Sequence, residues 1–239
     1  MFGYYYGFDL TYLVLVLPCV ILAMIASAKV NSTFKRYSQV HSLRRVSGAQ
    51  AAQRVLSANG VSGVRIERVS GNLTDHFDPK TNVIRLSENV YDATSVAAIG
   101  VACHEAGHAV QYAHHYAPIK LRAAIIPITN IGSKLAMPLI LLGLLLSFGE
   151  TLSYGFVYAG IACFSLSLVF QLVTLPVEFN ASRRAMNAIA DSNILTDEEQ
   201  KGARKTLTAA AMTYVAATAV ALAQLLRLLV IFGGRRRDD

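Results

Sequence analysis

The segment His104-Glu105-Ala106-Gly107-His108 places two imidazoles four residues apart, with a carboxylate directly after the first. On an α-helix, positions four apart differ by about 40° around the axis and by about one turn along it, so both imidazoles can bind one ion. Zinc accepts such nitrogens at about 2.0–2.1 Å. Glu105 would project from the same face and could accept a proton from a metal-activated water. The spacing predicts a hydrolytic zinc site, with His104 and His108 as ligands and Glu105 as general base.

A catalytic zinc ion takes a third protein ligand, and the chain offers two candidates. His114 lies where metzincins place theirs, but those proteins need Gly at the position held here by Gln111, because their helix breaks sharply there. Without that break, His114 would lie about 9 Å further along the helix axis than His108. Glu178 would begin a polar helix, and a carboxylate would complete a site with an open fourth position. Glu178 is therefore the preferred candidate and His114 the alternative.

The motif needs a helix, and the surrounding sequence predicts one. Ser95 is a suitable N-cap, and the helix is expected from Val96 to about Tyr116, ending before Pro118. Periodicity and turn residues predict further elements upstream. These are a helix over residues 47–59 and short strands over 61–69 and 83–86.

Long apolar runs indicate that much of the chain lies in a bilayer. Hydrophobic residues make up 54% of the chain and charged residues 15%, whereas soluble domains carry about 25% charged residues. The apolar runs cover residues 10–28, 123–148, 155–175 and 207–232. Gln224 and Arg227 interrupt the last run, so the sequence leaves open whether it crosses completely. We predict a mainly α integral membrane protein with about four transmembrane helices and a small α+β, zincin-like catalytic domain.

Five segments follow from this pattern. They are a tail with the first transmembrane helix (1–28), a cytoplasmic catalytic region with the motif helix (29–122), a transmembrane hairpin (123–175), a helix with the third zinc ligand (176–206), and an apolar helix with a basic tail (207–239). The net charge is +7, but basic residues flank apolar segments and no groove-reading motif is present, which argues against a nucleic-acid partner.

The basic residues also predict the orientation. Lys and Arg are frequent in regions 29–122 and 176–206, whereas residues 1–9 and the connector 149–154 contain none. By the positive-inside rule, both basic regions should be cytoplasmic and the connector should lie outside. The arginines at 235–237 are an exception if the last run spans.

Specific segments carry a resemblance to a known family. They are residues 104–111 (HEAGHAVQ), 178–185 (EFNASRRA), 73–79 (LTDHFDP) and 83–87 (VIRLS). With them, nearly the whole chain resembles the YugP-type neutral zinc metallopeptidases of bacteria. The resemblance implies Glu178 as third ligand and a more distant kinship to the Ste24 and HtpX membrane proteases.

Those distant relatives carry an Asp four residues after the ligand Glu, where it supports the metal site from behind. This chain has Ser182 at that position, so the support must differ, and Asn180 or Arg183 are candidates for it. Alternatively, Asn180 is a surface amide and Arg183 faces lipid phosphate. Arg183, Tyr112 and His76 are candidate oxyanion donors, although a structural role is expected for each.

The strand containing Val83, Ile84 and Arg85 is expected to be an edge strand. A peptide substrate would then add to it as a further strand, or it would be an ordinary sheet edge.

Together these features predict a membrane-embedded zinc endopeptidase with one Zn²⁺ per chain. It would hydrolyse membrane-proximal segments of proteins at the cytoplasmic face of a bacterial plasma membrane. The alternatives are a site-2-type intramembrane protease and a non-catalytic zinc-stabilised membrane scaffold. The expected partners are a protein or peptide substrate and the lipid bilayer; the sequence does not identify the substrate or the oligomeric state.

Overall fold

The computed structural model describes residues 9–145 and 150–233, and most of them are helical. The chain divides into two compact units. The polar unit comprises Ala26–Lys120 and Leu175–Thr213; the apolar unit comprises Leu121–Thr174 together with the described residues up to Ile25 and from Tyr214 onward. Each unit has its own cluster of buried apolar side chains.

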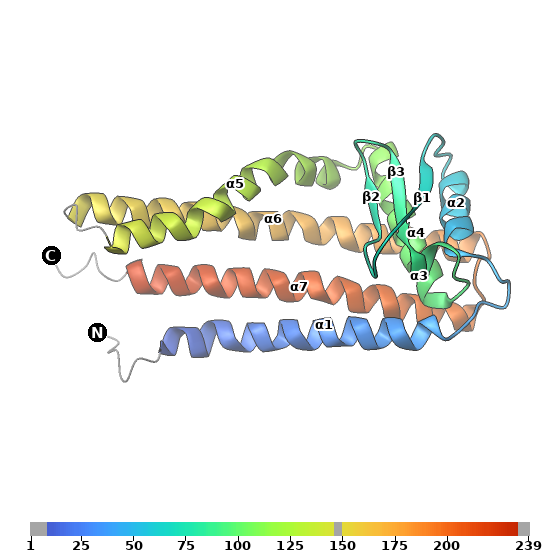
Figure 1. Cartoon of the computed structure of the whole chain (residues 1–239), viewed down its shortest axis with the longest axis horizontal. Coiled ribbons are helices and arrows are strands. Elements are labelled where there is room, and N and C mark those ends of the chain that lie inside the picture. The colour runs from blue at the N-terminus through green and yellow to red at the C-terminus, as the bar shows by residue number, and fades with distance from the viewer. Residues whose placement is uncertain (1–8, 146–149, 234–239) are drawn as a thin grey trace. The chain divides into compact units, whose positions relative to one another are not determined.

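Four of the described helices are long and apolar enough to cross a membrane. They are α1 (Leu17–Ser38) with the π-helical turn η1 (Tyr12–Val16) before it, α5 (Ala117–Leu145), α6 (Glu150–Asp191) and α7 (Asp197–Gly233) (Figure 1). Many of their apolar side chains are exposed, and Leu145 and Met24 are 76% and 67% exposed. Apolar surface of this extent is stable in lipid rather than in water. The fold is therefore mainly α with membrane helices, which confirms the predicted class.

An ion pair lies within the apolar unit. The Arg227 Nε atom on α7 donates to Asp9 Oδ2 at 2.9 Å, and the Arg227 guanidinium lies 5.6 Å from the ring centroid of Tyr12. A charged side chain on an apolar helix is costly unless it has such partners. The pair thereby joins α7 to the residues that begin the first helix.

The polar unit contains a three-stranded sheet, which lies in front of α4 in Figure 1. The strands of this sheet are β1 (Arg65–Val69), β2 (His76–Asp78) and β3 (Val83–Ser87). The shorter helices of the unit are α2 (Gly48–Ala58), α3 (Glu88–Tyr91) and α4 (Val96–Ala113). The strand order is β1-β3-β2; β3 pairs in parallel with β1 and antiparallel with β2. Ile84, Leu86 and Ile99 are fully buried between the sheet and the helices.

Local sequence signals explain the helices of this unit. Ser47 and Gln50 form a reciprocal capping box at the start of α2, and the Ser95 side chain accepts a hydrogen bond from the Ala98 N–H at the start of α4. Both helices were predicted. The strand β2 was not, because its three residues run directly into the Asp78-Pro79 turn and are too few to show alternation.

The helix α6 also differs from the sequence prediction, in which Glu178 begins a separate polar helix. The helix runs without interruption through Pro176 and carries Glu178 well inside its length. Proline removes one backbone hydrogen bond and crowds the preceding turn, a cost that the packing of a long helix can offset.

Candidate metal centre

The motif helix α4 brings two imidazoles together in the polar unit. The ring centroids of His104 and His108 are 4.7 Å apart and their planes are nearly perpendicular, at 84°. His108 and Glu105 are buried, and the His104 side chain is 15% exposed. The site is thus largely enclosed, and His104 is the more exposed of its two histidines.

The third side chain comes from α6. The Glu178 Oε2 atom lies 3.3 Å from His104 Nε2 and 3.6 Å from His108 Nε2, and the Glu178 side chain is only 2% exposed. The two helices approach very closely here, since a Cβ atom on Gly107 would lie 2.7 Å from the Ala181 carbonyl oxygen. Gly107, inside the motif, is therefore what allows α6 to bring Glu178 up to the histidines.

The arrangement fits a zinc ion. One potential ligand atom from each of His104, His108 and Glu178 lies within 4.8 Å of the others. Two ligands at about 2.0–2.1 Å from a tetrahedral zinc ion are roughly 3.4 Å apart, which is close to the two distances to Glu178 Oε2. Two imidazoles and one carboxylate also match the ligand set of catalytic sites with an open position.

The other ring nitrogen of each histidine has its own partner. His104 Nδ1 lies 3.1 Å from Ser182 Oγ, and His108 Nδ1 lies 3.0 Å from Gln111 Oε1. Such contacts orient the rings and direct Nε2 toward the metal position. Ser182, the residue four positions after Glu178, therefore contacts His104 directly, whereas Asn180 and Arg183, the candidates named from the sequence, do not.

A hydrogen-bonded network continues behind His108. Gln111 Nε2 donates to Asn180 Oδ1 at 3.0 Å, and Arg184 Nε donates to the same oxygen at 2.8 Å. Asn180, which the sequence analysis named as a candidate support, belongs to this network and is not itself hydrogen-bonded to any of the three candidate ligands. Sequence reasoning did not select Gln111 or Arg184, although a carboxamide three residues after His108 in a buried helix was a usable signal. The other candidate, Arg183, is exposed at the surface of α6.

The charges of the site act on His108. Its burial alone would lower its pKa, but the hydrogen bond to Glu178 and the negative charges of Glu105 and Glu178 raise the pKa above the usual value. A positive charge at this position is therefore favoured. A divalent cation would meet the same negative potential.

The alternative ligand is not part of this cluster. His114 ends α4 as its C-cap, and its Nε2 lies 3.4 Å from the Asn59 carbonyl oxygen. Two of the three candidate oxyanion donors have other contacts: Tyr112 packs edge-on against Phe77, and His76 Nδ1 contacts the Thr74 carbonyl oxygen at 2.8 Å.

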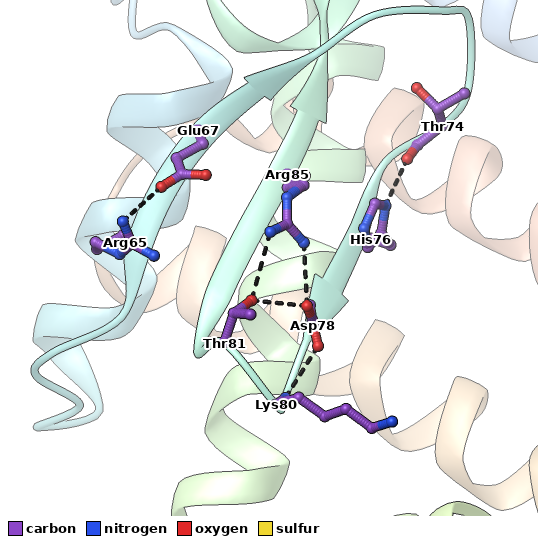
Figure 2. A network of polar contacts seen from close by, with 8 residues as sticks. All are labelled: Arg65, Glu67, Thr74, His76, Asp78, Lys80, Thr81 and Arg85. Atoms are coloured by element: carbon purple, nitrogen blue, oxygen red, sulfur yellow. Dashed lines mark hydrogen bonds and ion pairs between the residues drawn. The ribbon is translucent and has the colours of Figure 1, made fainter.

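The prediction of an edge strand at Val83, Ile84 and Arg85 is wrong. β3 is the central strand, with β1 on one side and β2 on the other, so its backbone cannot accept an additional strand. Figure 2 shows that Arg85 instead reaches Asp78 on β2, at 3.2 Å.

The same region forms a compact turn around one carboxylate. Hydrogen bonds from Thr81, the Lys80 N–H and Arg85 hold the pKa of Asp78 below its usual range (Figure 2). These contacts close the connection between β2 and β3. β2, the strand that the sequence did not predict, is the outer strand on this side of the sheet.

Cys103 lies beside the first motif histidine. It is completely buried in the core of the polar unit, and this burial strongly raises the pKa of its thiol. Its side chain packs with apolar residues and does not belong to the cluster of converging ligands.

Long apolar helices, together with two histidines and a glutamate around one point, define a membrane protein with a candidate metal site. The family model described as "Putative neutral zinc metallopeptidase" matches residues 12–233, and the chain belongs to this family. The chain is also 44% identical over 218 residues to the "Putative membrane protease YugP" of Bacillus subtilis (strain 168), covering 91% of this chain and 95% of that protein. No solved structure matches the chain significantly.

Proposed function

We propose that this chain is a zinc-dependent endopeptidase, with His104, His108 and Glu178 as the metal ligands. The observation that carries the proposal is the convergence of these three side chains within 4.8 Å, in a family named for zinc metallopeptidase activity. The name of the relative from Bacillus subtilis, a membrane protease, agrees with this proposal.

Zinc held by two imidazoles and one carboxylate would supply a Lewis acid that polarises a peptide carbonyl and lowers the pKa of water. Glu105 is the group in the chain that would move the proton. It is buried on α4 next to His104, and its charge acts on His108. Its carboxylate would accept a proton from the attacking water and deliver it to the leaving amine.

We propose that the substrate peptide binds along β2. This outer strand pairs with β3 on one side, and Phe77 of β2 packs on Tyr112 of α4, four residues beyond His108. A peptide added to the other side of β2 would form main-chain hydrogen bonds and extend the sheet. Such a peptide must be locally extended, which favours unfolded or flexible segments as substrates.

We propose further that the polar unit lies in the cytoplasm of a bacterial cell and acts on segments close to the plasma membrane. The excess of Lys and Arg in regions 29–122 and 176–206 supports this orientation. α4 is not among the helices long and apolar enough to span, which argues against a site-2-type intramembrane protease. Reporter fusions after residues 60 and 195 should report the cytoplasm, and a fusion at 151 the outside; an external signal at residue 60 would reverse the orientation.

The deciding experiment compares the parent protein with Glu105→Gln in native membranes. Both should carry about one zinc per chain, whereas hydrolysis of a membrane-tethered peptide should fall by at least about 10²–10⁴-fold in the variant. Glu198→Gln, at a side chain that is 83% exposed, is the matched control and should change neither quantity. If Glu105→Gln keeps its zinc and every cellular activity of the parent, the protein is a zinc-stabilised scaffold rather than an enzyme.

A further inference from the structure

Gln111 is a fully buried side-chain amide between the two helices that carry the converging ligands. Its Oε1 atom lies 3.0 Å from His108 Nδ1, and its Nε2 atom donates to the Val177 carbonyl oxygen at 2.8 Å and to Asn180 Oδ1 at 3.0 Å. An amide is costly to bury unless its polar atoms are bonded. Here both ends are engaged, and each end contacts a different helix.

The direction of every bond in this chain of contacts is fixed by the Val177 carbonyl. A peptide oxygen can only accept, so the amide nitrogen of Gln111 must face Val177 and its oxygen must face His108. An amide oxygen also only accepts, so the proton of that contact must reside on His108 Nδ1. The Nε2 atom of the neutral ring then carries the lone pair that a metal ion would take up.

The nitrogen end of Gln111 also controls the third ligand. Val177 precedes Glu178 and Asn180 follows it by two residues, so the amide holds α6 on both sides of the ligand carboxylate. Arg184 Nε donates to the same Asn180 oxygen and keeps it facing Gln111.

We propose that Gln111 is a positioning residue that sets the tautomer of His108 and at the same time fixes Glu178 relative to it. This inference rests on the ligand set of the proposed function, and it adds the side chain that holds two of these ligands in a fixed relation. One amide couples two of the three ligands, so its loss should affect the metal through both.

The other histidine provides an internal contrast. His104 Nδ1 contacts the Ser182 hydroxyl at 3.1 Å. A hydroxyl can donate or accept, so Ser182 supports either tautomer of its ring. The tautomer of His108 is therefore imposed by the fold, whereas that of His104 is adaptable.

The test uses the full-length protein with Gln111→Met, which keeps the volume and removes the amide, and Gln111→Glu, which keeps an acceptor for His108. The control is Gln53→Met, at an exposed position on α2. The first measurement is the tautomer of His108 by ¹⁵N NMR of the metal-free protein, at a pH where the ring is neutral. The second is zinc affinity by competition with a chelator, with the Co²⁺ absorption spectrum as a report on ligand geometry.

The parent and Gln111→Glu should show a proton on Nδ1 of His108, and Gln111→Met should show a mixture of tautomers. Zinc affinity should fall by about 10–100-fold in Gln111→Met, with a changed Co²⁺ spectrum, and should be unchanged in Gln53→Met. A parent with the proton on Nε2, or a Gln111→Met protein with unchanged tautomer or affinity, overturns the proposal. If Gln111→Met does not fold, the parent and Gln111→Glu tautomers decide.

These outcomes are separate from those of the proposed function. A parent that binds zinc but hydrolyses no peptide refutes the peptidase and leaves the tautomer and affinity results standing. A parent that hydrolyses peptide while Gln111→Met keeps parental zinc affinity refutes the role of Gln111 alone.

Discussion

The two units bury their apolar side chains in different ways. In the polar unit, residues such as Leu86 and Ile99 are fully enclosed by protein, within one large cluster. In the apolar unit, the buried cluster is small, and many large apolar side chains, including Leu145, are exposed. The polar unit is thus stabilised by burial within protein, whereas the apolar unit requires lipid to cover its helices. Rigid positioning of a metal site calls for the first kind of packing.

The largest expected effect tests this contrast directly. Leu86→Ala should lower the free energy of unfolding by about 2–5 kcal/mol, because it leaves a cavity in a close-packed core. Leu145→Ala removes the same atoms from a side chain that is 76% exposed and should have an effect below about 0.5 kcal/mol in bicelles. Chemical unfolding followed by circular dichroism would measure both; equal losses would mean that the units do not differ in this way.

A second test concerns the close contact between α4 and α6 at the candidate metal centre. Gly107→Ala adds a Cβ atom 2.7 Å from the Ala181 carbonyl oxygen, so α6 must move away from α4. We expect a cost of about 1–3 kcal/mol in stability and a marked fall in zinc affinity.

The matched control is Gly100→Ala, on the same helix, where the added atom would make ordinary contacts of 3.6 Å or more with Ala203. Gly100→Ala should bind zinc as the parent does and gain slightly in stability from helix propensity. Parental zinc affinity in Gly107→Ala would contradict the idea that this glycine sets the distance between the ligands.

The smallest effect is expected from the ion pair of the apolar unit. A double-mutant cycle with Asp9→Asn and Arg227→Gln should give a coupling free energy of about 0.6 kcal/mol and no more than about 1.7 kcal/mol. Zinc affinity should be unchanged in all members of the cycle. A larger coupling free energy would mean that polar interactions also stabilise the apolar unit substantially, contrary to the contrast drawn between the two units.

The sequence predicted what depends on local spacing. The membrane helices follow from the length of the apolar runs. The N-cap at Ser95 and the pairing of His104 with His108 on one helix face follow from the spacing of a few residues. The nearness of Glu178 came from the resemblance and from a choice between two candidates, because no local rule joins α4 to α6. That Glu178 binds metal stays a prediction until zinc content is measured.

What the sequence could not predict depends on tertiary arrangement. In the sequence, Gln111 was informative only because it occupies the position where metzincins need Gly. Its hydrogen-bond partners Val177 and Asn180 lie on another helix, so no local pattern reveals them. The error at β3 has a similar origin: strand order is a property of the whole sheet, and the three-residue β2 that covers β3 is too short to detect.

Complete burial of Cys103 has a consequence for chemical reactivity. Thiolate, not thiol, is the form that reacts with oxidants and alkylating agents and that competes for metals. Because burial strongly raises the pKa of Cys103, this sulfur stays protonated and inaccessible although it is the direct neighbour of His104. The centre should therefore tolerate peroxide and maleimide reagents, and any labelling of the folded protein should occur at Cys19 or Cys163, which are only partly buried.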